Sequence, residues 1–279
     1  VSVPLLETVK GRPMSTPDSV AGLPYVRFSL YYFFLFMVNG IVFPYLPVIL
    51  DAMGLSRTRI GGVLGLAPLV AVFAPPVWGT LADLLTSRKR VLFVAIAAGG
   101  VCFLLLAVTG SVASAAVLVL LYYVCREAVI PLSDGLTFSH IGRHGGDYGR
   151  IRAWGSLGFV VSAALMAAVG AGAGGRVQPL FLFYALFCGA QLAGCLALPT
   201  APPPEGAEGE GAPWHLLRGW TVWAFVFAAF IARASMMGYY SFFSLYLQQE
   251  IGLPGVGYLW ALGPIAEIPV IFFAGWMIR

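Results

Sequence analysis

The sequence predicts an all-α membrane protein, and two observations lead to this fold class. Hydrophobic residues make up 59% of the 279 residues and charged residues only 10%, whereas soluble domains carry about 25% charged residues. The apolar residues also form runs of the length that a spanning helix needs, about 20 residues. Because these runs are continuous and do not alternate with polar residues, they favour helices over the strands of a membrane barrel.

Eight apolar runs follow one another along the chain. Residues 1–23, which precede the first run, are polar and show no pattern typical of a cleaved signal peptide. We expect this segment to be a cytoplasmic tail. The predicted spans cover residues 27–50, 60–83, 91–110, 115–138, 151–173, 179–198, 219–247 and 255–278.

The basic residues between the spans predict the orientation of the chain. Of the 16 Lys and Arg residues, eleven fall on the side of the N-terminus and three on the opposite side. By the positive-inside rule the N-terminus is cytoplasmic, and we expect the plasma membrane or an inner membrane as the location. The basic residues are spread between apolar runs and form no single patch, which argues against a nucleic-acid partner.

Nothing in the sequence indicates a cofactor or a metal site. The four cysteines lie within apolar runs and lack CxxC spacing, so we interpret them as buried apolar side chains. A membrane-embedded enzyme would need a nucleophile with a base, or a metal cluster, at matched depth. We find neither pattern, and therefore expect that the protein is not an enzyme.

A segment of different composition separates the first six spans from the last two. Residues 199–217 include a stretch rich in Pro, Gly and Glu, which predicts a cytoplasmic linker. Residues of the second span recur in the eighth at an offset of 196: Gly61, Leu66, Pro68 and Gly79 as Gly257, Leu262, Pro264 and Gly275. This offset covers six spans and predicts a parallel repeat of two bundles. We expect a six-helix N-terminal bundle over 24–198 and the first two helices of a C-terminal bundle over 218–279. With four more helices then expected and a first residue other than Met, we interpret the sequence as a fragment.

The start of the fifth predicted span carries the most specific motif. Residues 148–159, YGRIRAWGSLGF, resemble the corresponding stretch in the major facilitator superfamily, in the proton-symporter branch that includes lactose permease, phenylpropionate permease and nucleoside symporters. The resemblance covers nearly the whole chain and implies the major facilitator fold. It also implies that Arg152 pairs with Asp134 of the fourth span and holds the substrate, and that Phe159 stacks on it. The alternative is that Arg152 is an interfacial anchor.

A second stretch resembles the superfamily signature between the second and third spans. In it Gly79 is expected to supply a tight turn, and Asp83 to face the basic residues Arg88 and Arg90. The resemblance implies a conformational latch between the two halves. Leu84 stands where an arginine is usual, so we expect this latch to be weakened. The alternative is that the basic residues only set the topology.

A third stretch, residues 259–269, resembles the eighth span of the phenylpropionate and nucleoside members, where an acid occupies the position of Glu267. Charged side chains near the bilayer centre cost at least about 2.5–3.5 kcal/mol each, so they are expected to face partners, water or substrate. Secondary transporters bind their substrates at this depth, between the repeats. The candidates at mid-span are Asn39, Arg126, Glu127, Asp134, Arg233 and Glu267.

Structural ion pairs are the alternative interpretation of these charges, with Arg126 bound to Glu127 or Arg233 to Glu267. Adjacent residues on a helix do not face each other, so we expect Arg126 and Glu127 to have different partners. Asn39 has the alternative role of joining two helices by a hydrogen bond.

These features predict a secondary active transporter that works by alternating access, a proton-coupled symporter of a small polar organic solute such as a sugar, a nucleoside or an aromatic carboxylate. Burial favours the protonated form of a carboxyl group and a nearby arginine favours the ionised form, so we expect Glu267 or Asp134 to exchange the proton. The expected partners are the solute, the proton and the lipid bilayer. The alternative function is a transporter-like membrane receptor or scaffold that does not transport.

Overall fold

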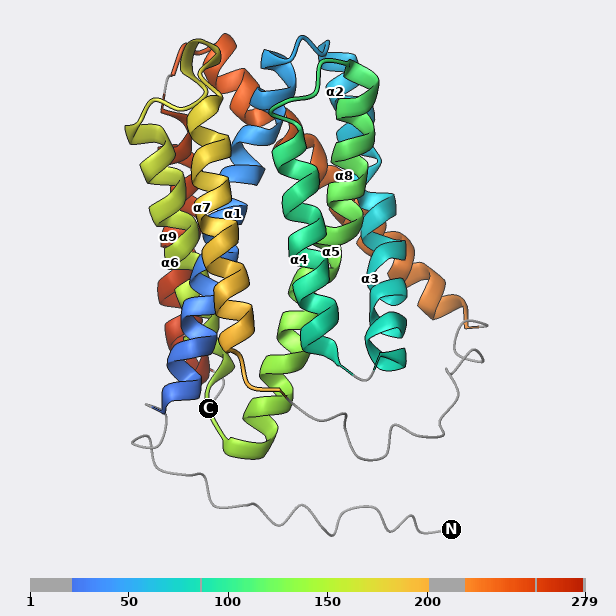
Figure 1. Cartoon of the computed structure of the whole chain (residues 1–279), viewed down its shortest axis with the longest axis vertical. Coiled ribbons are helices and arrows are strands. Elements are labelled where there is room, and N and C mark those ends of the chain that lie inside the picture. The colour runs from blue at the N-terminus through green and yellow to red at the C-terminus, as the bar shows by residue number, and fades with distance from the viewer. Residues whose placement is uncertain (1–21, 86, 201–218, 254, 278–279) are drawn as a thin grey trace.

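The computed structural model describes residues 22–85, 87–200, 219–253 and 255–277, and every regular element in this part of the chain is helical. The predicted tail over 1–23 and the predicted linker over 199–217 lie almost wholly outside the described residues. The helices stand side by side along the long axis of the molecule (Figure 1). They are α1 (Leu23–Ala52), α2 (Arg57–Gly65), α3 (Ala67–Leu84), α4 (Arg88–Leu105), α5 (Val112–His144), α6 (Tyr148–Ala168), the short 3-10 helix η2 (Ala173–Gly175), α7 (Gln178–Ala197), α8 (Trp220–Gln249) and α9 (Val256–Met277).

Each of the eight predicted spans overlaps this helical pattern, with α2 and α3 together forming the second. Six of the described helical segments are long and apolar enough to cross a membrane. The remaining two are α4, whose first turn holds three basic residues, and α9, whose described apolar part is the shorter segment Val256–Ile271. The chain is therefore a multi-pass membrane protein.

The second span is broken in the middle and the fifth ends early, for local reasons. Pro68 lies in the first turn of α3, where its missing N–H costs no helical hydrogen bond. Ser56 caps the start of α2 by accepting a hydrogen bond from the backbone N–H of Arg59 at 3.4 Å. At the end of α6, Gly170 and Gly172 adopt positive φ angles of 63° and 82°, which a helix does not accommodate. The predicted fifth span, 151–173, therefore stops at residue 168.

Helix α6 lies between α1 and α9 at very short distances. A Cβ atom added to Gly158 of α6 would overlap the carbonyl oxygen of Phe33 in α1, and one added to Gly257 of α9 would overlap the carbonyl oxygen of Ala163 in α6. Glycine lets helix backbones approach in this way because it has no side chain. These contacts fix where the side chains of α1, α6 and α9 meet.

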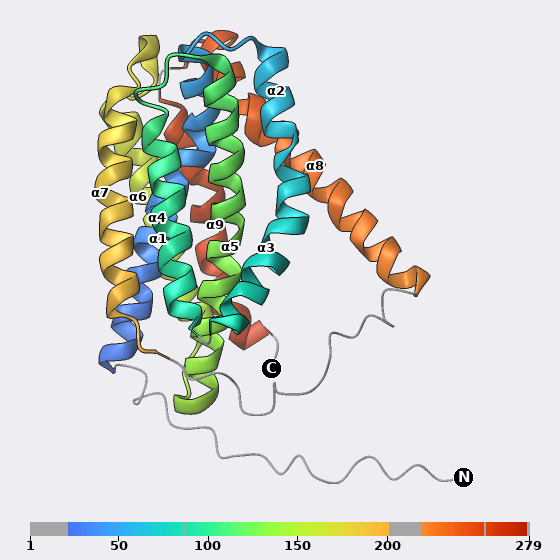
Figure 2. The same ribbon diagram turned by 45° about the vertical axis from the view of Figure 1, so that its right-hand side comes forward.

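Helix α8 is packed at one end and exposed at the other. We call the end of the bundle where α1 begins the near face and the opposite end the far face. Figure 2 shows α8 leaning away from the bundle toward the near face. Its first residues, such as Trp220 and Phe225, are exposed, whereas Ser244 and Leu245 in its second half are buried. The contacts of α8 with the rest of the chain are therefore concentrated toward the far face.

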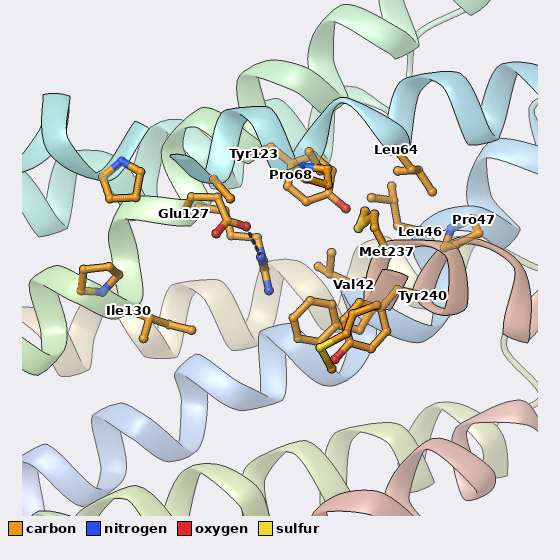
Figure 3. A pocket seen from close by; sticks show the side chains of 17 residues that line it. Val42, Leu46, Pro47, Leu64, Pro68, Tyr123, Glu127, Ile130, Met237 and Tyr240 are labelled. Carbon is orange, nitrogen blue, oxygen red and sulfur yellow. Dashed lines mark hydrogen bonds and ion pairs between the residues drawn. The ribbon is translucent and has the colours of Figure 1, made fainter. Parts of the chain in front are cut away.

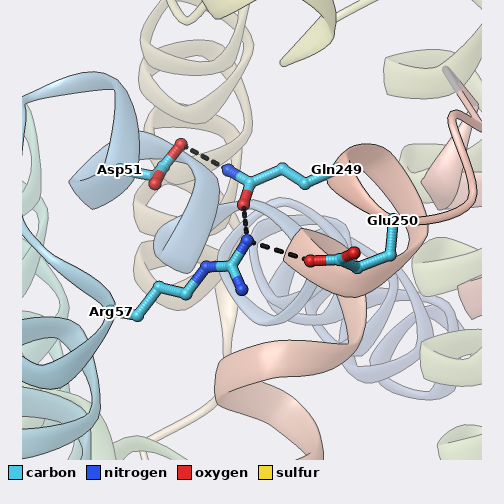
Figure 4. A network of polar contacts seen from close by, with 4 residues as sticks. All are labelled: Asp51, Arg57, Gln249 and Glu250. Atoms are coloured by element: carbon cyan, nitrogen blue, oxygen red, sulfur yellow. Dashed lines mark hydrogen bonds and ion pairs between the residues drawn. The ribbon is translucent and has the colours of Figure 1, made fainter.

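Four polar side chains join the halves of the chain at the far face (Figure 4). Arg57, at the start of α2, donates hydrogen bonds to Gln249 at 2.8 Å and to Glu250 at 3.1 Å. Gln249, at the end of α8, donates in turn to Asp51 near the end of α1, at 2.9 Å. We call Asp51, Arg57, Gln249 and Glu250 the far-face network.

Candidate substrate site

Besides a cavity of about 360 Å³ at the far face, beside Asp51 and Gln249, two cavities between α8 or α9 and the preceding helices contain the candidate charges. The α5 cavity, of about 430 Å³, is lined by α1, α2, α3, α5 and α8 and contains Arg126 and Glu127 (Figure 3). The α6 cavity, of about 300 Å³, is lined by α1, α6, α8 and α9 and contains Arg152 and Glu267. Each cavity thus combines one basic and one acidic side chain with apolar and aromatic walls.

A pair of stacked aromatic rings forms a wall common to both cavities. Phe43 of α1 and Tyr240 of α8 line the α5 cavity and the α6 cavity alike. Their ring centroids are 5.2 Å apart and the rings are inclined by 21°. Because one ring belongs to α1 and the other to α8, movement of α8 relative to α1 changes the separation between the two cavities.

Arg126 is held by three neighbours at the edge of the α5 cavity. Its guanidinium donates to Oε1 of Glu127 at 3.0 Å and to Oδ1 of Asn39 at 3.3 Å. It also lies 4.3 Å from the centre of the Phe43 ring. The side chains of Arg126 and Glu127 are only 12% and 13% exposed. The expectation that Arg126 and Glu127 have different partners is therefore wrong, and the alternative, an ion pair between them, is what the structure contains, because both side chains line the same cavity.

Arg152 and Glu267 occupy the α6 cavity together but bind different neighbours. The guanidinium of Arg152 lies 3.9 Å from the centre of the Phe36 ring. Ser156, one turn after Arg152 on α6, donates a hydrogen bond to Oε2 of Glu267 at 3.4 Å. Phe159 is buried and lines the same cavity, and its stacking on a solute there stays a prediction.

Asp134 lies outside both cavities. Its Oδ1 accepts hydrogen bonds from the hydroxyl groups of Tyr32 at 2.5 Å and Tyr148 at 3.0 Å. These two tyrosines take the place of Arg152, the partner that the family resemblance implied, and no ion pair joins Asp134 to Arg152 in the described part of the chain. Arg152 lies one turn after Tyr148 on α6, and its side chain extends to the Phe36 ring.

The candidate Arg233 belongs to α8, but its side chain lies outside the described residues. Its pairing with Glu267 therefore stays a prediction. Among the described residues, no group of three or more His, Cys, Asp or Glu side chains is placed to hold a metal ion.

Two members of the predicted latch are in contact. Nη2 of Arg88, at the start of α4, lies 3.6 Å from Oδ1 of Asp83, near the end of α3. The Asp83 side chain is largely exposed. Arg90 lies in the first turn of α4, where its backbone N–H bonds to Ser87. Gly79 lies inside α3, so the tight turn expected there is not present. An exposed pair such as Asp83–Arg88 contributes at most about 1 kcal/mol.

The spacing of aromatic residues on α1 is a signal that sequence reasoning missed. Phe36 and Phe43 are seven residues apart, which places them on one face of the helix two turns apart. Each supports one of the cavity arginines. A search for apolar rings at this spacing, next to charges of other spans, would have found them. Tyr240 and Ser156 gave no comparable signal, because their place follows from the packing of α8 and α6.

Residues 25–279 match the model of the MFS_1 like family, a match that covers nearly the whole chain. The chain belongs to the MFS_1 like family. This assignment confirms the predicted membership of the major facilitator superfamily, and agrees with the prediction that the protein is not an enzyme.

Curated relatives of this MFS_1 like chain are named as permeases and transporters. It is 31% identical over 255 residues to the maltose permease of Geobacillus stearothermophilus, covering 87% of this chain and 62% of the permease. It is 31% identical over 274 residues to the probable 3-phenylpropionic acid transporter of Escherichia coli strain K12, covering 88% of this chain and 65% of the transporter. The chain thus spans less than two thirds of the length of these relatives.

A solved structure confirms the fold. The nucleoside transporter NupG, in its D323A mutant form, superposes with a TM-score of 0.76 at 17% sequence identity, over 91% of this chain and 68% of NupG. At that identity the likeness concerns the arrangement of helices alone. The arrangement of the MFS_1 like chain is therefore the major facilitator fold that the sequence predicted.

Proposed function

We propose that the protein is a secondary active transporter and that a small polar organic solute binds in the α5 and α6 cavities. The observation that supports this proposal best is the pair of opposite charges inside each cavity, Arg126 with Glu127 and Arg152 with Glu267. Charges at mid-span are costly in lipid, and a polar solute that passes between the helices gives them a partner. The names of the curated relatives agree with this activity.

The cavity walls suit a solute that carries a ring. Phe43 and Tyr240 offer stacked faces between the cavities, and Trp260 lies against Tyr240 with ring centroids 5.5 Å apart. Arg126 and Arg152 offer N–H donors for hydroxyl, carbonyl or carboxylate oxygens. Sugars, nucleosides and aromatic carboxylates all have this combination of a ring and acceptor oxygens, and they remain the proposed solute classes.

We propose proton coupling through Glu267 or Asp134. Glu267 lines the α6 cavity and accepts a hydrogen bond from Ser156, so a solute and a proton can compete for the same carboxylate. Asp134 accepts hydrogen bonds from two tyrosine hydroxyls, one on α1 and one on α6, so its carboxylate is the acceptor that a proton would occupy. In either case the change of neighbours during the transport cycle alters how strongly the carboxyl group holds its proton.

We further propose that the structure represents a state closed at the far face. The far-face network links α8 to α1 and α2, whereas the first residues of α8 near Trp220 are exposed. Opening of the far face then requires these hydrogen bonds to break as α8 moves relative to α1. The count of basic residues assigns the near face to the cytoplasm, so this state would face inward.

Transport is tested with proteoliposomes that contain the product of the complete open reading frame encoding this sequence. Labelled sugars, nucleosides and aromatic carboxylates are supplied with an imposed proton gradient. We expect uptake of one class, loss of uptake with a protonophore, and loss of gradient-driven uptake in Glu267→Gln or Asp134→Asn. Glu208→Gln in the predicted linker is the matched control and is expected to transport normally.

Two results would contradict this proposal. Undiminished gradient-driven uptake in both carboxyl variants would exclude the proposed proton coupling. Saturable solute binding without any uptake would instead support the alternative function, a receptor or scaffold that does not transport.

A further inference from the structure

A much smaller cavity borders Arg126 among the helices of the first half of the chain. It is lined by α1, α4, α5 and α7 and has a volume of about 30 Å³. We call it the rear cavity. Its lining residues include Asn39, Tyr122 and Arg126. All four helices precede α8, and the rear cavity adjoins the α5 cavity at Arg126 and Ile130, which line both.

Three buried polar atoms of the rear-cavity lining have no hydrogen-bond partner of good geometry in the described part of the chain, although the Tyr184 hydroxyl in the same lining lies near that of Tyr122. They are Nδ2 of Asn39, the hydroxyl oxygen of Tyr122 and Nε of Arg126. The Asn39 and Tyr122 side chains are 3% and 2% exposed. Leaving such groups without a partner is costly, and native proteins satisfy nearly all of them with protein atoms or ordered water.

We propose that the rear cavity is a binding site for ordered water, which joins these three groups. A water molecule accepts hydrogen bonds from the N–H groups of Asn39 and Arg126 and donates one to the hydroxyl oxygen of Tyr122. Three hydrogen bonds are typical of buried water, and a cavity needs about 10–15 Å³ to hold one molecule. The rear cavity meets both requirements, with room for one or two water molecules.

Charge favours water over an ion in this place. All three groups are able to donate a hydrogen bond, so a halide ion has the right chemistry as well. Arg126 is, however, already neutralised by Glu127 at 3.0 Å. An anion would therefore add an uncompensated charge to the membrane interior, which is costly. A cation would face the guanidinium of Arg126, and water adds no charge.

The water has a positioning role. The terminal nitrogens of the Arg126 guanidinium bond to Glu127 and Asn39, and Phe43 covers one face of it. Nε is the one guanidinium nitrogen without a partner in the described part of the chain, and the water accepts from its N–H. With bonds to Glu127, Asn39 and the water, the guanidinium is held from three directions and presents one orientation to the α5 cavity. This step rests on the proposed function only as far as the α5 cavity binds solute.

The variant Tyr122→Phe tests the proposal, because the direction of the change in the unfolding midpoint shows whether the hydroxyl has a hydrogen-bond partner. If water bonds to the Tyr122 hydroxyl, its removal breaks a hydrogen bond, and we expect the unfolding midpoint of the purified protein to fall by about 2–4 °C. Tyr31→Phe is the matched comparison, because it removes a buried hydroxyl that has a direct partner, Ser133, at 2.7 Å. A rise in the midpoint of Tyr122→Phe would show that its hydroxyl has no partner, and would overturn the proposal.

A structure at a resolution that orders water decides between the remaining outcomes. With bromide in place of chloride, we expect one or two oxygen-sized peaks among Asn39, Tyr122 and Arg126, and no anomalous signal. An anomalous peak would show that a halide ion occupies the cavity and would overturn the assignment to water. A cavity without any peak would refute the binding site. Both experiments are independent of transport, so their failure is distinct from failure of the proposed function.

Discussion

The Arg126–Glu127 pair gives the sharpest prediction about stability. The variant Glu127→Gln keeps the size and the acceptor oxygen of the side chain but removes the charge that neutralises Arg126. Breaking a buried ion pair by removing one partner costs about 3–5 kcal/mol. Because the amide still accepts from the guanidinium, and Asn39 and Phe43 remain beside it, we expect a loss at the lower end, about 3 kcal/mol. This corresponds to a fall in the unfolding midpoint of roughly 6–12 °C.

The double variant Arg126→Met with Glu127→Leu is the control for this prediction. It replaces the pair by apolar side chains of similar volume, which is often neutral or stabilising, and we expect it to recover most of the lost midpoint. The assay is thermal unfolding in detergent, followed with a thiol-reactive dye. A fall below about 2 °C in Glu127→Gln, or a double variant less stable than Glu127→Gln, would refute the buried pair. Under the proposed function the double variant still loses uptake, despite its stability.

Two further predictions concern the packing of α6 and the closure of the far face. We expect Gly158→Ala to lower the unfolding midpoint in the same assay, because its methyl group would overlap the carbonyl oxygen of Phe33. The control Gly62→Ala adds its methyl group in open space and should leave the midpoint unchanged or raise it. Equal effects of the two variants would contradict the close approach of α6 to α1. Asp51 and Gln249 are joined by a side-chain hydrogen bond of 2.9 Å. We expect a cysteine pair at these two positions, bridged by a reducible bifunctional thiol reagent, to stop uptake until a reductant restores it. Uptake that continues with the bridge intact would show that the far face need not open there.

The sequence predicted the fold because the fold depends on hydropathy and on motifs that can be located without coordinates. Long apolar runs placed the spans, and residues 148–159 indicated the superfamily. The missed boundaries are local. Pro68 separates α2 from α3, and positive φ angles at Gly170 and Gly172 end α6. These features depend on backbone conformations that a hydropathy pattern does not specify.

The candidate site was predicted in part, because charge at mid-span is visible in a sequence but the direction of a side chain is not. Arg126 and Glu127 were chosen for their depth, and the structure places them in one cavity. Their mutual contact was predicted only as the alternative, since the rule for adjacent helical residues describes side chains near the helix axis and not the far ends of long ones. Asp134 accepts hydrogen bonds from two tyrosines instead of pairing with Arg152. The positions of these tyrosines follow from how α1 and α6 pack.

The central claim is that a solute binds in the α5 and α6 cavities, which share the wall formed by Phe43 and Tyr240. Tyr240→Cys, in the protein with every native cysteine replaced by serine, including the four of this sequence, places one thiol where both cavities meet. A membrane-impermeant maleimide reports its accessibility, and a cysteine at Phe138, which is exposed outside both cavities, is the control. We predict that the thiol at 240 is labelled and that the transported solute protects it, while the thiol at 138 is unaffected by solute. Labelling at 240 that no solute changes would contradict the account.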